Sequence, residues 1–193
     1  MQLEEIYRPP QADLETSTPA AQTRPLPPFF QTSPQKIVVL SVATFGIYQL
    51  YWFHKHWTRR KTYGEDVIPI LRTIFAVWFA HSLFQSVNRE VERTARPGVS
   101  FGGLAAEPLS AGALALGYFA LNLLWRLPDL ISMAGLFSFV PLMIAQKRIN
   151  QLHAEMGYDP AEGFSYSLGT VAALVVGGLW WLLIAIGIFM PEA

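Results

Sequence analysis

The sequence predicts an all-α integral membrane protein with four transmembrane helices, and two observations lead to this prediction. Hydrophobic residues make up 52% of the chain and charged residues only 15%, whereas an average soluble domain is about 25% charged. The apolar residues gather in four runs with almost no charge, at 37–53, 111–127, 130–145 and 168–190. Because backbone polar groups cannot stay unpaired in hydrocarbon, runs of this kind cross a membrane as helices.

The four runs differ in how well they meet the length of about 20 residues that a spanning helix needs. Run 168–190 meets it, 37–53 and 111–127 lie near the lower limit, and 130–145 is shorter. Only Pro128 and Asp129 separate the second run from the third. This tight polar break indicates a hairpin of two antiparallel spans.

The segment 67–96 is ambiguous. Its uninterrupted apolar part, 73–80, is short and is flanked by Arg72 and His81, a length more typical of a re-entrant or interfacial helix than of a span. Its second half is amphipathic, with apolar residues on one face (Leu83, Phe84, Val87, Val91) and polar residues on the other (Gln85, Asn88, Arg89, Glu92, Arg96). We therefore predict one re-entrant or interfacial helix beside the four spans, with five spans as the alternative.

Residues 1–35 are predicted to be a disordered tail, and residues 36–193 the transmembrane domain. Half of the 14 prolines lie in the tail, and a segment so poor in apolar residues cannot bury enough surface to order itself. The Pro-rich run 24–28 is typical of a plain linker, although it also resembles the core of an SH3 ligand.

The distribution of Lys and Arg predicts the orientation. The first run ends in an aromatic cluster that is expected to anchor it at the membrane surface (Tyr48, Tyr51, Trp52, Trp57), and a basic stretch overlaps and follows it. If 67–96 does not cross, the most basic segments, 54–66, 85–109 and 146–167, share one side. The positive-inside rule makes that side cytoplasmic, with both termini outside. If the segment crosses, this asymmetry shrinks.

Two stretches carry a family resemblance. Residues 44–57, Thr-Phe-Gly-Ile-Tyr-Gln-Leu-Tyr-Trp-Phe-His-Lys-His-Trp, and the opening residues 7–12, Tyr-Arg-Pro-Pro-Gln-Ala, resemble a group of uncharacterised bacterial inner-membrane proteins. The resemblance implies a multi-pass protein of a bacterial inner membrane. It supplies no catalytic or binding residues.

Small residues recur at four-residue intervals along the last run, as Ser165, Gly169, Ala173 and Gly177. Such a stripe lets a second helix backbone approach closely, which is how membrane helices associate. The groove is filled either by another span of the same chain or by a homo-oligomer or another membrane protein.

Ionisable residues near the membrane are candidates for a polar pathway. The sequence offers Arg72, His81, Arg126 and Asp129. In the alternative interpretation His81 faces the headgroups or forms hydrogen bonds within the bundle, while Arg126 and Asp129 pair with each other or with lipid phosphates.

The remaining features argue against other functions. The chain has no cysteine, which excludes thiolate catalysis and Cys-ligated metals, and His54 and His56 are two residues apart and point in different directions on a helix. No catalytic motif, cofactor site or metal site is predicted, and the zero net charge gives no sign of nucleic-acid binding. We expect a non-enzymatic protein of the lipid bilayer that acts through helix association, or alternatively a small transporter or channel component.

Overall fold

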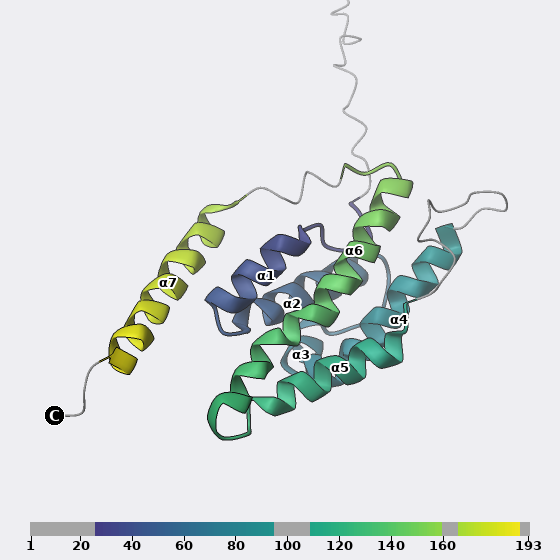
Figure 1. Cartoon of the computed structure of the whole chain (residues 1–193). Coiled ribbons are helices and arrows are strands. Elements are labelled where there is room, and N and C mark those ends of the chain that lie inside the picture. Colours follow the sequence, from purple (N-terminus) through teal and green to yellow (C-terminus); the bar gives the residue numbers. More distant parts are fainter. Residues whose placement is uncertain (1–25, 95–108, 160–165, 190–193) are drawn as a thin grey trace, which may run out of the picture.

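The computed structural model describes residues 26–94, 109–159 and 166–189, and within these ranges every regular element is a helix (Figure 1). The predicted all-α class is thus confirmed. The elements are α1 (Pro34–Ala43), α2 (Ile47–Thr62), α3 (Pro69–Ile74), α4 (Ala76–Thr94), α5 (Ala111–Leu124), the 3-10 helix η1 (Asp129–Ser138), α6 (Phe139–Glu155) and α7 (Leu168–Phe189).

Among the helices in the described ranges, one is long and apolar enough to cross a membrane, namely α7 over Leu168–Gly187. The apolar helices α1 and α5 have 10 and 14 residues. At a rise of about 1.5 Å per residue they extend about 15 and 21 Å, against about 30 Å of hydrocarbon. The predicted arrangement of four spanning helices is therefore not supported.

The predicted first span, 37–53, is a helical hairpin instead. The chain breaks between α1 and α2 at Phe45 and Gly46, whose φ angles of 49° and 87° lie in the left-handed region, which glycine adopts without steric cost. The Thr44 hydroxyl donates to the Leu40 carbonyl (2.7 Å) and accepts from the Tyr48 amide (3.0 Å). One side chain thus bonds to backbone groups of both helices. The turn could not be recognised in the sequence, because the residues on both sides of it are apolar.

The start of α1 and the end of α2 lie at the same end of the molecule. The Phe30 amide donates to His56 Nδ1 at 3.4 Å, and the Tyr63 hydroxyl donates to the Leu26 carbonyl. The segment 26–33, which we predicted to be part of a disordered tail, is therefore packed against the bundle. These contacts place 26–33 beside the end of α2, so the structure does not support the predicted separation of the N-terminal side from 54–66.

The ambiguous segment 67–96 forms two helices, α3 and α4, with a break at Phe75. The buried face of α4 includes Leu83, Phe84 and Val87, and Gln85 is among the exposed residues. This agrees with the amphipathic pattern seen in the sequence.

The runs 111–127 and 130–145 are not two regular spans. The first is α5, and the second begins as η1 and continues as α6. Figure 1 shows α5 running to a turn at the lower left and α6 running back from it, so a hairpin does form. Its second arm continues past the apolar run as a polar helical extension that ends at Glu155, where such an extension was predicted.

The two ends of the bundle differ in chemistry. At one end, Arg60 of α2 pairs with Glu65 and with Glu90 of α4, and Gln31 donates to the Asp159 carbonyl that follows α6. The basic residues Lys55, Arg59, Lys61, Arg89 and Arg93 lie on the same helix segments. We call this the basic end.

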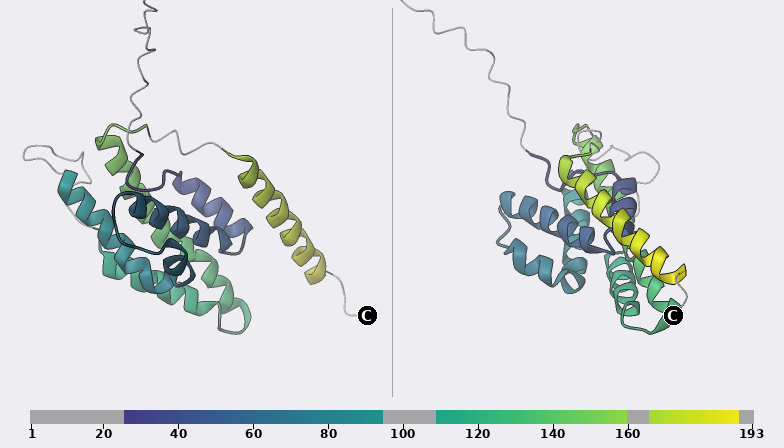
Figure 2. Two further views of the ribbon diagram at one scale, coloured as in Figure 1. Left: turned by 180° about the vertical axis from the view of Figure 1, so that it is seen from behind. Right: turned by 90° about the vertical axis from the view of Figure 1, so that its left-hand side faces the viewer.

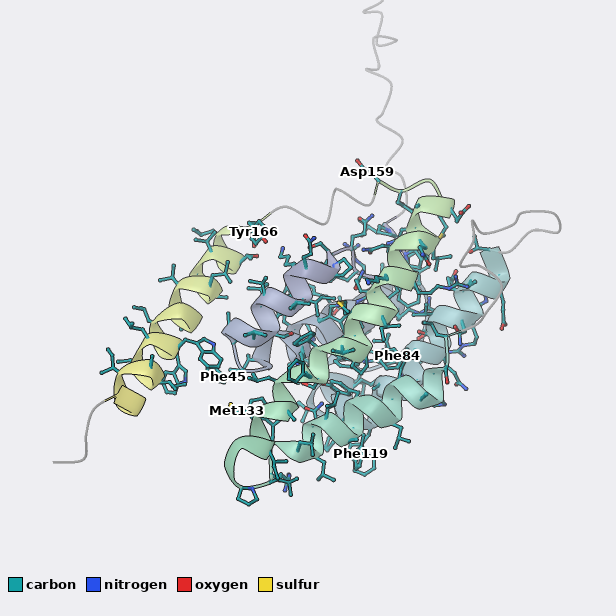
Figure 3. All side chains as sticks on the ribbon, viewed as in Figure 1. Phe45, Phe84, Phe119, Met133, Asp159 and Tyr166 are labelled. Carbon is teal, nitrogen blue, oxygen red and sulfur yellow. The ribbon has the colours of Figure 1, made fainter. Side chains whose placement is uncertain are left out.

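The opposite end is apolar. It is formed by the α1–α2 turn, the α3–α4 break and η1, which share a cavity lined by Phe45, Ile74, Trp125 and Ser138 among others. Large apolar side chains are exposed there, including Ile74 at 68% and Phe137 at 58%. Figure 3 shows Phe45 and Met133 toward this lower end, and Asp159 and Tyr166 toward the upper one. We call it the apolar end.

The predicted membrane-surface anchors mostly lie in the core. Trp52 and Trp57 are fully buried and Tyr48 is 8% exposed, whereas Tyr51 is 47% exposed. The expectation of an aromatic belt was therefore wrong for three of the four. These large side chains fill the space between α2 and the elements packed around it.

Candidate functional site

Helix α7 docks on α1 through its small residues. Gly177 is buried, and a Cβ at this position would lie 2.8 Å from the carbonyl carbon of Ala43 and 3.0 Å from its Cβ. One turn further, Trp181 Nε1 donates to the Val42 carbonyl at 3.0 Å, and the indole stacks on Phe45 at 4.6 Å. At this point the groove of α7 is filled by α1 of the same chain.

The two helices run in the same direction. The ammonium group of Lys36, near the start of α1, lies 5.8 Å from the ring of Tyr166, just before α7, and Ala43 at the end of α1 meets Gly177. Figure 2 shows α7 beside α1 at the edge of the bundle. The start of α7 therefore lies at the same end of the molecule as the start of α1.

The other residues of the predicted stripe do not pack as tightly. Gly169 and Ala173 line a cavity between α7, α1 and α2, and Ser165 lies outside the described residues. The cavity has a volume of about 310 Å³ and is lined by Phe30, Lys36, Leu40, Thr44, Ile47, Tyr48, Tyr51, Ser167, Gly169, Thr170 and Ala173. We call it the α1–α7 cavity.

Most of α7 is uncovered. Only 11% of its most apolar window is buried within the described structure, and Val176, Leu179 and Leu183 are each more than half exposed, at 67%, 57% and 62%. Trp180 is 58% exposed, whereas its neighbour Trp181 contacts Val42 and Phe45. Such a surface requires lipid or another protein to cover it.

A buried polar network at the basic end joins three parts of the chain. The amide oxygen of Gln146 on α6 accepts from Trp52 Nε1 at 2.8 Å and lies 3.3 Å from His56 Nε2. Its amide nitrogen donates to the Phe30 carbonyl (3.2 Å) and to Asn150 Oδ1 (2.8 Å). The network therefore ties the N-terminal segment to α2 and α6.

Two histidines are buried in this region. Burial lowers the pKa of His56 to about 3, against the opposing effect of its hydrogen bond to Gln146. Burial, with a smaller contribution from the charge of Arg59, lowers the pKa of His153 to about 4. Neither ring nitrogen of His153 has a hydrogen-bond partner among the described residues. Both rings are therefore neutral at pH 7.

A buried cation, Arg60, lies at the same end of the bundle and is only 3% exposed. Its guanidinium group contacts Glu65 at 2.6 Å and Glu90 at 3.0 Å and lies 5.0 Å from the centre of the Phe29 ring. Although burial alone would lower the pKa of Arg60, the two carboxylates raise it overall. Among the described side chains, no group of three or more His, Asp or Glu is placed to hold a metal ion.

The residues of the predicted polar pathway are not gathered in one place. Arg72 lies over the rings of Trp57 (4.4 Å) and Phe79 (5.2 Å), whereas His81 and Arg126 are exposed. The side chain of Asp129 lies outside the described residues. Neither of the two cavities described above is lined by Arg72, His81 or Arg126.

The sequence analysis missed the polar network, although a signal for it was present. Gln49, His56 and Arg60 recur on one face of α2 at helical spacing, interleaved with Trp52 and Phe53. This face is the buried one. In the sequence the same residues looked like the solvated end of a span.

Comparisons with known proteins add no identification. No family model matches the chain, and neither a curated protein nor a solved structure is significantly similar to it.

Proposed function

We propose that the chain is a non-enzymatic protein of a bacterial inner membrane that acts through helix association, with α7 as the helix that meets a second copy or another membrane protein. The observation that carries this proposal is the uncovered surface of α7. The helix is held to its own chain along one line, through Gly177 and Trp181, and its remaining faces are apolar and exposed.

The bilayer accounts for the division of the bundle into two ends. Soluble monomers rarely expose apolar patches larger than a few hundred Å², and basic segments stay on the cytoplasmic side. In this proposal α7 crosses the membrane, and the hairpins α1–α2 and α5–η1–α6 enter it from the basic, cytoplasmic side. Non-helical backbone at membrane depth is tolerated where it is buried in protein, and the α1–α2 turn has its hydrogen bonds made by Thr44.

Cysteine cross-linking in membranes tests the association. The native chain has no cysteine, so each single-cysteine variant reports on one position. Val175→Cys, Val176→Cys, Leu179→Cys and Leu183→Cys sample the exposed faces of α7, and Ala173→Cys is the matched control on the face toward α1. We expect disulfide-linked species to peak at positions three or four residues apart.

The size of the linked species identifies the partner. A species of twice the chain mass indicates a second copy, and any other mass that depends on the cysteine indicates a different membrane protein. If none of the exposed positions forms more cross-linked product than Ala173→Cys, the exposed faces meet only lipid and the association proposal is wrong.

A further inference from the structure

The α1–α7 cavity has walls from three helices. Below it, toward the apolar end, α7 is held against α1 by Gly177. Toward the start of both helices a space of about 310 Å³ remains, with Lys36 and Leu40 on the α1 side and Thr170 and Ala173 on the α7 side. Figure 1 shows α7 standing at the margin of the bundle, so the cavity lies where lipid would surround the protein.

The lining is divided between polar and apolar groups. The polar groups lie near the starts of the two helices, where Lys36 is joined by the hydroxyl groups of Ser167 and Thr170, 3.1 Å apart. Further along, the lining is mainly apolar, with side chains such as Leu40, Ile47 and Ala173, and the Thr44 hydroxyl there is already bonded to backbone groups. The ligand suited to this arrangement has an anionic head and an apolar tail.

Lys36 supplies the charge complementarity. Its side chain is 8% exposed, and burial lowers its pKa because the charged ammonium group loses hydration. As a cation in the cavity lining, the ammonium group favours a headgroup with a net negative charge over a zwitterionic one, whose own cation offsets its phosphate.

The volume limits how much of a lipid can enter. Sites for small molecules span about 300–1,000 Å³, so a cavity of about 310 Å³ is too small for a whole phospholipid. We propose that the α1–α7 cavity binds one acyl chain of an anionic phospholipid, with the phosphate beside Lys36, Ser167 and Thr170 and the rest of the lipid in the surrounding bilayer. This site is separate from the exposed faces of α7 on which the association proposal rests.

Native mass spectrometry of the full chain in detergent, with added dioleoyl phosphatidylglycerol or dioleoyl phosphatidylcholine, tests the site. Ala173→Leu fills the cavity, and Ala172→Leu makes the same change at an exposed neighbour. We expect Ala173→Leu to lower phosphatidylglycerol binding roughly tenfold, because added volume in an occupied site is poorly tolerated. Ala172→Leu should bind as the native chain does.

A second pair of variants tests the charge. Lys36→Gln should abolish the preference for phosphatidylglycerol over phosphatidylcholine, whereas Lys147→Gln, at an exposed position, should keep it. This pair adds no volume and decides the proposal even if Ala173→Leu does not fold, as judged by its thermal transition in circular dichroism.

Three outcomes would overturn the proposal: equal lipid binding by Ala173→Leu and Ala172→Leu, an unchanged preference in Lys36→Gln, or thermal protection by inorganic phosphate equal to that by phosphatidylglycerol. The last outcome would indicate a site for a free anion. Because the readout is lipid binding, these results are independent of the cross-linking of α7.

Discussion

Two adjacent glycines on α7 provide a test of how this helix is held. Gly177 faces Ala43 so closely that an added methyl group would lie 2.8 Å from the Ala43 carbonyl carbon, while nothing lies within 4 Å of a methyl group at Gly178. Gly177→Ala and Gly178→Ala therefore make the same chemical change in the same helix, one against α1 and the other in open space.

The two variants should change the stability of the protein in opposite directions. Alanine in place of glycine within a helix stabilises it by about 0.8–1 kcal/mol, and this gain is expected in full at Gly178. At Gly177 the added methyl group overpacks the contact with α1, which costs about 1–3 kcal/mol, so the net change lies between about zero and a loss of about 2 kcal/mol. For a chain of this size about 1 kcal/mol shifts the midpoint by about 2–4 °C, so the two variants should melt roughly 2–12 °C apart.

Thermal unfolding of both variants in one detergent, followed by circular dichroism, gives the comparison. Gly177→Leu should enlarge the loss, since a branched side chain cannot be accommodated by a small shift of backbone. If Gly177→Ala is stabilised as much as Gly178→Ala, α7 does not dock on α1 at this point, and the reasoning from the close approach fails.

Two further outcomes are expected at the basic end. Phe29 is fully buried, so Phe29→Ala should lower the free energy of unfolding in denaturant by about 3–5 kcal/mol, as for other buried Phe side chains. Leu26 is 54% exposed, so Leu26→Ala should be nearly neutral. In the folded chain the pKa is about 3 for His56 and about 4 for His153, whereas an unburied histidine has a pKa of 6.5. Between the folded and unfolded pKa values, the unfolded chain therefore binds more protons than the folded chain does. The free energy of unfolding should therefore be highest above pH 6.5. It should fall by about 3 kcal/mol for each histidine as the pH is lowered from 6.5 to 4. His153→Phe should flatten this dependence and His81→Gln, at an exposed position, should leave it unchanged; equal pH profiles for His153→Phe and the native chain would contradict the assignment.

The helical class could be predicted because it depends on composition and on long apolar runs. The location and length of α7 followed for the same reason, since 168–190 is long, almost wholly apolar and free of proline and charge. The buried face of α4 could also be predicted, because apolar and polar residues alternate there with helical period.

The break within 37–53 could not be predicted, because a turn inside an apolar run leaves no trace in hydropathy. The break at Phe45 and Gly46 depends on one glycine and on the Thr44 hydroxyl, and both residue types also occur inside spanning helices. The 3-10 helix η1, which packs against α5, likewise has no signature in hydropathy.

The candidate site was predictable in part. Of the stripe that spacing identified, Gly177 packs closely on α1, whereas Gly169 and Ala173 line the α1–α7 cavity. Whether such a stripe meets the same chain or another is a matter of tertiary arrangement. The polar network at Gln146 and His56 was missed because its members are far apart in the sequence. The helical spacing of Gln49, His56 and Arg60 marks a polar face of α2, but it does not indicate that the partner of this face lies on α6.

The central claim is that α1 and α2 form a hairpin that enters and leaves the membrane on the basic side, and the most direct measurement is the labelling of single cysteines at Gln35 and Thr62. Both positions are exposed, and each flanks the hairpin at the same end. In intact cells an impermeant thiol reagent should leave both Gln35→Cys and Thr62→Cys unlabelled, and permeabilisation should expose both. Labelling of Gln35→Cys in intact cells, with Thr62→Cys protected, would place the two residues on opposite sides of the membrane and show that 37–53 is a continuous span.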